Sequence, residues 1–223
     1  VELNTQGGDI RKVTLLQVSS AKDRAKPLTL LEPDAKHFYV VQTGLLAPGL
    51  PTHLSAWTAE QTDYAMGSQD RLEVRFKAAG SQGVEVTKTY VFHRGTYAME
   101  VVFDVANKGT SPISPTGYFQ FLRDGNPPSE EAAQTSAFAG VTTFTGPAVY
   151  TEESKFTKVD FADITKGKQS HPKRAKDGWI GMVQHYFVSA WMPPKGAERE
   201  FYTTAVGENR FSAGLKVGLG SLA

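Results

Sequence analysis

The chain has 223 residues, no cysteine and a formal net charge of +1 from 24 basic and 23 acidic residues. The lack of cysteine excludes thiol chemistry, disulfides and cysteine-based zinc sites. The near-neutral charge gives no reason to expect nucleic-acid binding. We expect one domain over residues 1–223, because all-β architectures of this length commonly fold as one. Since the chain begins with Val1 rather than methionine, we also expect a processed product or a fragment of a longer protein.

In chain order, short apolar runs predict strands at Ile10–Val18 and His37–Gln42, ahead of the clearest pattern in the chain. That pattern covers residues 71–105, where apolar residues alternate with charged residues and threonines. Glycine turns at residues 79–83 and 94–96 divide it into three strands. We therefore expect an antiparallel meander with one buried and one solvated face. The third strand is expected to bury Tyr97, Met99, Val101, Phe103 and Val105.

The second half of the chain also predicts strands and very little helix. Further strands are expected at Tyr118–Leu122, Ala137–Phe144, Phe201–Val206 and Phe211–Val217. Only Glu130–Thr135 and Phe161–Thr165 have patterns that suit one or two helical turns. Many short strands between glycine and proline turns indicate an all-β fold, a large sandwich of antiparallel sheets with at most one or two short helices.

Residues 178–194 form the most informative segment, with two of the three tryptophans and no charged residue. As a helix, Trp179–Met192 would rise only about 21 Å, short of the roughly 30 Å hydrocarbon core of a bilayer. As one strand it would exceed the usual length. We expect two consecutive buried strands with a bend near Gln184 and His185, ended by Pro193 and Pro194.

Reactive chemistry has little support in the sequence. No two of the five histidines have the spacing of zinc ligands, and Gly-x-Ser-x-Gly is absent. Gly167-Lys168 lacks the glycine and hydroxyl residue of a phosphate-binding loop. We therefore expect no catalytic residue, no metal and no cofactor.

One basic cluster is the candidate site. It consists of Lys166, Lys168, Lys173, Arg174 and Lys176. Such a cluster suits anionic lipid headgroups or an acidic partner surface. The alternative is a solvated loop just before the apolar strands, since Asp163 and Asp177 flank the cluster.

Four blocks of the sequence resemble one known family, in the family's order. They are Asn4–Asp9, Thr87–Tyr97, Phe144–Tyr150 and the segment Gly178–Pro194. In this order they resemble the large periplasmic domain of YidC-type bacterial membrane protein insertases, of the YidC/Oxa/Alb family. None of the four blocks is a catalytic signature.

The resemblance implies a super-sandwich similar to galactose-mutarotase-like domains. It also implies a non-catalytic domain at the periplasmic face of the Gram-negative inner membrane, anchored through flanking helices that are not in these residues. Such a domain would help nascent membrane proteins to insert and fold, by docking to the SecD–SecF accessory complex of the Sec translocon or by guiding translocated segments. One alternative is a periplasmic carbohydrate-binding or mutarotase-like enzyme domain, which would need a histidine acid and a carboxylate base across a sugar ring. The other is a free-standing lectin-like or structural sandwich with no membrane parent.

Overall fold

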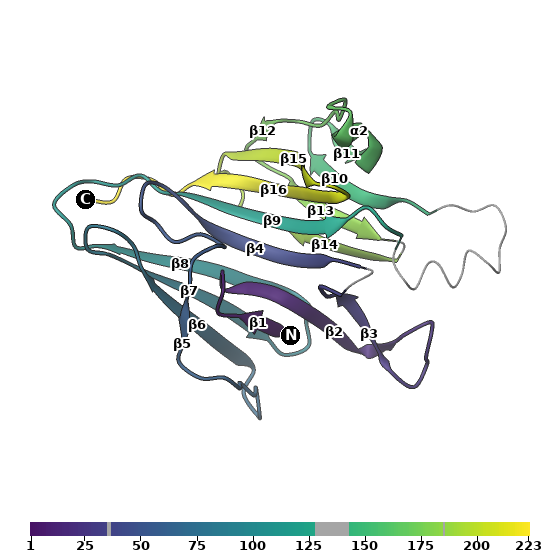
Figure 1. Ribbon diagram of the computed structural model, residues 1–223, viewed down its shortest axis with the longest axis horizontal. Helices are drawn as coiled ribbons and strands as arrows, with labels where there is room; N and C mark the ends of the chain where they lie inside the picture. The colour runs from purple at the N-terminus through teal and green to yellow at the C-terminus, as the bar shows by residue number, and fades with distance from the viewer. Residues whose placement is uncertain (35–36, 128–142, 185) are drawn as a thin grey trace. The chain divides into compact units, whose positions relative to one another are not determined.

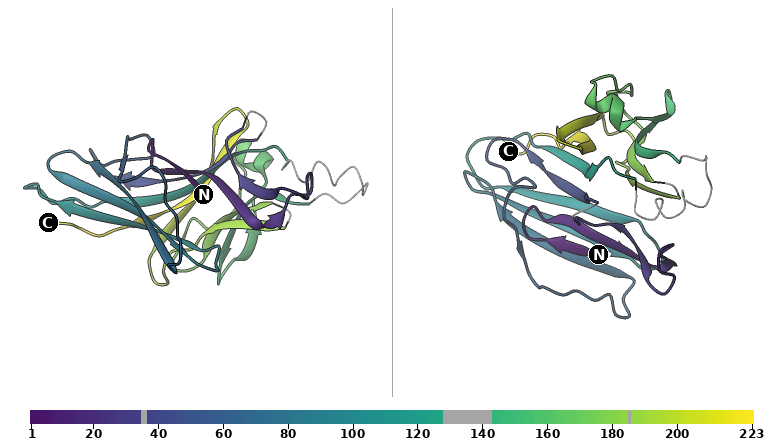
Figure 2. Two further views of the ribbon diagram at one scale, coloured as in Figure 1. Left: turned by 90° about the horizontal axis from the view of Figure 1, so that it is seen from below. Right: turned by 45° about the vertical axis from the view of Figure 1, so that its right-hand side comes forward.

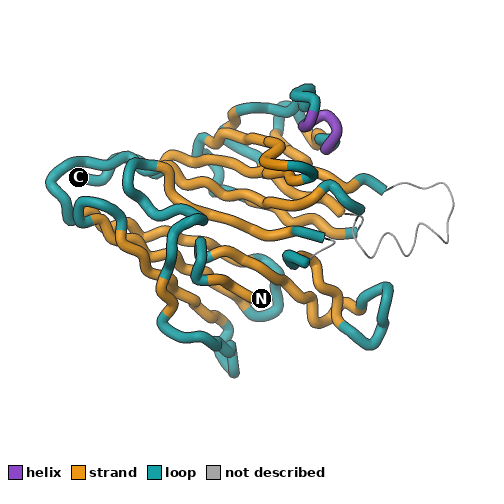
Figure 3. Tube along the Cα trace, viewed as in Figure 1, coloured by secondary structure: helices purple, strands orange, loops and turns teal. Residues whose placement is uncertain are grey.

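A computed structural model describes residues 1–34, 37–127, 143–184 and 186–223. Strands dominate these residues, and the one helix among them is α2 (Phe161–Thr165), as Figure 3 shows. No helix of the described residues is long and apolar enough to cross a membrane. The all-β prediction is confirmed. The chain divides into two compact units. It passes from one unit to the other after Leu3, Asp9, Gln42, Gly117 and Gly218.

Unit 1, which comprises residues 1–3, 10–42 and 118–218, carries two antiparallel sheets (Figure 1). The larger sheet has the order β1 (Glu2–Asn4), β2 (Asp9–Ser19), β4 (Tyr39–Leu46), β9 (Thr116–Asp124), β16 (Arg210–Gly218), β15 (Arg199–Gly207) and β12 (Arg174–Ala175), with β3 (Pro27–Leu31) beside β2. The smaller sheet has the order β11 (Lys155–Lys158), β10 (Thr145–Thr151), β13 (Trp179–Gln184) and β14 (Phe187–Trp191). Figure 2 shows these strands from two further directions, with the small sheet in green.

The two sheets of unit 1 pack face to face. Ile180 and Met182 of β13 are fully buried. The Trp191 ring of β14 lies 5.3 Å from the Phe119 ring and 5.9 Å from the Phe121 ring, both on β9. Aromatic side chains of this size supply much of the burial that holds two sheets together. The predicted sandwich is therefore present within unit 1.

Unit 2, which comprises residues 4–9, 43–117 and 219–223, is built on the predicted meander. Its sheet has the order β5 (Thr58–Ala59), β6 (Arg71–Ala79), β7 (Val84–His93) and β8 (Met99–Asn107). The alternation is confirmed along β8, but the residues expected on the buried face (Met99, Val101, Phe103 and Val105) are half-buried rather than buried. Tyr97, which we expected on the buried face, is exposed because the strand begins only at Met99.

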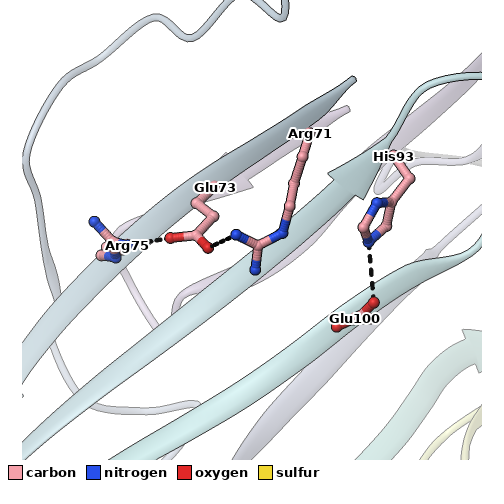
Figure 4. Close-up of polar contacts among 5 residues, drawn as sticks. All are labelled: Arg71, Glu73, Arg75, His93 and Glu100. Atoms are coloured by element: carbon pink, nitrogen blue, oxygen red, sulfur yellow. Dashed lines mark hydrogen bonds and ion pairs between the residues drawn. The ribbon is translucent and has the colours of Figure 1, made fainter. Parts of the chain in front are cut away.

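The outer face of this sheet is charged along β6, as predicted, but Thr89 and Val91 of β7 are buried on that side. Figure 4 shows Glu73 in ion pairs with both Arg71 and Arg75, and His93 bonded to Glu100 at 3.0 Å. Arg71, Glu73 and Arg75 are thus paired along one strand, and His93 bonds to the next strand. Exposed pairs of this kind add little stability but leave the face hydrophilic.

The apolar segment before Pro193 forms two strands, as expected, but β14 is not buried and exposes Val188. β13 and β14 pair antiparallel, with Val183 opposite Val188. The bend expected at His185 lies outside the described residues, as do the predicted helix Glu130–Thr135 and residues 137–142 of the strand predicted at Ala137–Phe144. β10 and β11 were not predicted. The single helix matches the predicted bounds Phe161–Thr165.

Candidate partner-binding segment

The five basic residues of the candidate site lie in one stretch, residues 166–176, here named the basic segment. The structure divides them into two groups. Lys166 and Lys168 follow α2, whereas Lys173, Arg174 and Lys176 lie on or beside β12. Both α2 and β12 pack against β15, so one strand supports both groups. All five side chains are exposed.

The first group has a fixed backbone because α2 is anchored in the core. Ile164 packs in a buried cluster with Val159 and Phe211. The Lys166 N–H donates to the carbonyl of Ala162 at 3.2 Å, and the Lys168 N–H donates to that of Asp163 at 2.8 Å. These bonds close the end of the helix, so the two lysines leave it from defined backbone positions.

In the second group, Arg174 lies in the two-residue end strand of the large sheet, and Lys173 and Lys176 flank it in the loop. Arg174 stands opposite Glu200 of β15, and their side chains are 3.2 Å apart. Lys216 approaches the same carboxylate at 3.4 Å. Hydrogen bonds from Arg174 and Lys216 lower the pKa of Glu200. Arg174 is thereby paired, whereas the four lysines of the segment have no ion pair within the described part of the chain.

His171 anchors the middle of the basic segment. Its side chain is buried, and its Nδ1 atom lies 2.8 Å from the carbonyl oxygen of Pro172. Its Nε2 atom lies 3.1 Å from the hydroxyl of Thr203 on β15. A neutral ring suits both bonds, with Nδ1–H donating to the carbonyl and Nε2 accepting from the hydroxyl. Burial lowers the pKa of His171, which favours this neutral form.

Arg199 fixes the loop that follows the basic segment. Its guanidinium is buried and donates to the carbonyls of Lys176, Gly178, Pro193, Pro194 and Ala197 at 2.8–3.3 Å. Burial lowers the pKa of Arg199, opposed by the charge of Asp177. The planar guanidinium carries five N–H donors, and here it bridges two loops through their backbones.

A buried lysine in unit 2 was not predicted as a notable residue. Lys88 lies on β7 with 0% of its surface exposed. Its Nζ atom donates to the carbonyls of Gly7 at 2.6 Å and Thr43 at 3.1 Å, and lies 4.6 Å from the Trp57 ring centroid. Burial lowers the pKa of Lys88 to about 7, and the charge of Asp9 opposes that shift. The sequence could have indicated this burial, because in the alternating pattern of the strand Lys88 takes the core-facing position between Val86 and Tyr90.

The histidines do not come together as a reactive site. His53 is half-buried, and its pKa is lowered by burial and by the charge of Lys88. His93 lies on the solvated face of unit 2, as predicted, and His185 lies outside the described residues. Among the residues that the structure describes, no cluster of histidine, aspartate and glutamate could hold a metal ion.

The four sequence blocks meet in pairs. The Tyr90 hydroxyl, in the second block, donates a short hydrogen bond to the carbonyl of Gly8 in the first. The third and fourth blocks pair as β10 and β13, with Tyr150 opposite Trp179. At the start of the fourth block, Gly178 has φ +84°, and a Cβ atom there would lie 1.8 Å from the carbonyl oxygen of Tyr150. Each pair therefore forms one packed structural element.

Comparison with known proteins gives a consistent result. The family described as the YidC periplasmic domain matches residues 1–222. A protein of Nitrosospira multiformis is 45% identical over 99% of this chain and 38% of its own length. A protein of Nitrosomonas europaea is 42% identical over 100% of this chain and 36% of its own length. A protein of Aromatoleum aromaticum is 45% identical over 97% of this chain and 38% of its own length. All three carry the name "Membrane protein insertase YidC", and this chain spans little more than a third of each.

Proposed function

Because this chain belongs to the YidC periplasmic domain family, we propose that it serves a membrane protein insertase as a non-catalytic docking domain at the periplasmic face of the inner membrane. The whole insertase would help inner-membrane proteins to insert and fold. This part of it would bind the SecD–SecF accessory complex of the Sec translocon or guide translocated segments.

The observation that carries the proposal is an exposed, positively charged segment on a fixed backbone. Four lysines extend from α2, β12 and the turns beside them, while Arg199, His171 and the β12–β15 ladder hold their main chain. A preorganised basic surface steers and orients an acidic partner without an ordering cost at the moment of binding.

The enzyme alternative finds no comparable support. A mutarotase-like mechanism needs a histidine and a carboxylate on opposite sides of a sugar ring. The His93–Glu100 pair does not meet that need, since the two side chains bond directly to each other at 3.0 Å on an open sheet face.

The docking role is tested with the full-length insertase in its native membranes. We would solubilise membranes that carry a tagged protein and measure how much SecD–SecF and how much arrested translocating chain co-purifies. The test variant is K173E/K176E, which reverses two unpaired charges of the basic segment. The matched control is K22E/K26E, which changes the same number of lysines elsewhere in unit 1.

We expect K173E/K176E to lose most of the co-purified partner while K22E/K26E retains it. If both variants retain the co-purified partner, the basic segment is not part of the contact. If the unaltered protein retains neither SecD–SecF nor a translocating chain, the docking role itself is wrong.

A further inference from the structure

The small sheet of unit 1 has an outer face that points away from the core of the sandwich. Cross-strand partners project on the same side of a sheet. Tyr150 stands opposite both Phe156 and Trp179, and all three therefore share the outer side. By the same register the outer side carries large apolar residues from every strand. We name as the aromatic face Tyr150, Phe156, Trp179, Val183 and Val188, together with two residues next to the strand ends, Phe144 before β10 and Met192 after β14.

The side chains of the aromatic face lie against one another and against the sheet. The Tyr150 and Trp179 rings stack with centroids 6.0 Å apart, and the Phe156 ring lies 5.9 Å from that of Trp179. Beneath them the sheet has room only for a glycine. A Cβ atom at Gly181 would lie 3.2 Å from the Trp179 ring and 3.1 Å from Val188. The result is a flat, preformed apolar surface.

This surface is open to solvent in the part of the chain that the structure describes. Phe156 is 47% exposed, Val188 54% and Met192 70%. Contiguous apolar surface of this kind marks an interaction site more often than a solvated face. The outer face of the unit 2 sheet shows the contrast, because its ion pairs make it hydrophilic (Figure 4).

The charges of the aromatic face have one sign. Lys158 is the only ionisable residue on the outer side of these strands apart from Tyr150, and its Nζ atom lies 5.0 Å from the centroid of the Phe144 ring. No strand position on this side carries Asp or Glu. Lys155 stands at the adjoining turn, within 3.6 Å of Glu152. Aromatic residues with a polar atom, aliphatic residues and lysine are the combination that settles at a bilayer surface, with rings at headgroup level and cations on anionic lipid.

We propose that the aromatic face of the β11–β10–β13–β14 sheet rests on the headgroup region of a bilayer that contains anionic phospholipid. This is a second surface, separate from the basic segment and beyond the docking role proposed above. Tyr150 and Trp179 lie at the headgroup boundary, Phe156, Val188 and Met192 enter the apolar margin, and Lys158 pairs with phosphate.

Vesicle flotation with the 223-residue chain tests the proposal. The vesicles contain phosphatidylcholine with or without phosphatidylglycerol. The variant F156S/M192S removes two exposed side chains of the aromatic face, and L16S/V206S removes two apolar side chains that are at least half exposed, at 81% and 55%, from other strands of unit 1. Circular dichroism and thermal unfolding confirm that each variant is folded. Tryptophan fluorescence adds a local probe, since Trp57 is buried and Trp191 packs on Phe119 and Phe121.

We expect the unaltered chain to float with the anionic vesicles, less at high salt, and with a blue shift of emission that W179F abolishes. F156S/M192S should weaken partitioning by about tenfold or more, while L16S/V206S behaves as the unaltered chain. No flotation of the folded chain, or equal flotation of F156S/M192S, overturns the proposal. If the unaltered chain does not float but sediments as a dimer, and F156S/M192S sediments as a monomer, the aromatic face binds a second copy of the chain instead. None of these results depends on SecD–SecF, so the outcome is distinct from that of the docking test.

Discussion

The Nζ atom of Lys88 lies 2.6 Å from the carbonyl oxygen of Gly7, across 81 positions of the sequence. The same nitrogen reaches the carbonyl of Thr43, and the neighbouring Tyr90 hydroxyl binds that of Gly8. One buried lysine therefore joins the first turn of the chain to the middle of the unit 2 sheet. This arrangement leads to two predictions.

Replacing Lys88 should destabilise unit 2. The variant K88M keeps most of the side-chain volume but leaves the carbonyls of Gly7 and Thr43 without their donor, and removes the counter-charge of Asp9. We expect a loss of about 3 kcal/mol in the free energy of unfolding, measured in urea. The control is K77M, which removes an exposed lysine paired with Glu60 and should change stability by less than about 1 kcal/mol. Equal losses in the two variants would contradict a special role for Lys88.

Stability should also rise with pH above neutrality. Burial lowers the pKa of Lys88 from 10.5 to about 7. Between these values the unfolded chain binds a proton that the folded chain does not, so raising the pH favours folding. We expect the free energy of unfolding to increase by about 2 kcal/mol from pH 7 to pH 9. This range lies below the pH at which Tyr39, with its pKa raised to about 12, begins to ionise in the folded chain. The gain should be absent in K88M, and an equal gain in K88M would assign it to other groups.

Gly178 should not tolerate even alanine. Its φ is +84°, and the added Cβ atom would lie 1.8 Å from the carbonyl oxygen of Tyr150. Gly196 is a matched control, since its φ is +85° and a Cβ atom added there would have no other atom within 4 Å. We expect G196A to cost about 1 kcal/mol from its backbone conformation alone, and G178A to cost about 3 kcal/mol or more. Thermal or urea unfolding compares them, and similar costs would mean that the contact with Tyr150 relaxes freely.

The two faces of β8 should respond differently to the same charge. Val101 is half-buried on the core side of the strand, and Val102 lies on the other side, 40% exposed. We expect V101K to destabilise the protein by about 3 kcal/mol, because a lysine there must bury its ammonium or distort the sheet. V102K should stay within about 0.5 kcal/mol of the unaltered protein. The yield of soluble protein and its urea midpoint are the measurements, and a tolerated V101K would mean that the pattern was misassigned.

The meander of unit 2 could be predicted because its residues alternate strictly over three consecutive strands. The strand β10 could not, since Gly146-Pro147 suggests a turn. In the structure Pro147 sits just beyond the end of its pairing with β11, where its carbonyl accepts from the Val159 N–H at 2.9 Å and no donor is needed.

The candidate site was predictable as composition but not as geometry. The basic cluster is evident from the sequence, whereas β12 is a two-residue strand with no pattern of its own, formed because β15 offers it an edge. Arg199 gave no signal, because its partners are backbone carbonyls from two loops that only the fold brings together. The aromatic face was hidden for a related reason, since the order of β10, β11, β13 and β14 decides which side of each strand faces outward.

Arg199 holds the backbone at the end of the basic segment and leaves the lysine side chains unbound. The guanidinium bonds to the carbonyl of Lys176 and not to its side chain. Likewise, the bond from Phe201 reaches the carbonyl of Lys173. The side chains at these two positions can therefore be exchanged freely, with the backbone beneath them unchanged. In the docking role proposed above, binding specificity at this edge could be reprogrammed one residue at a time, without a search for compensating changes in the core.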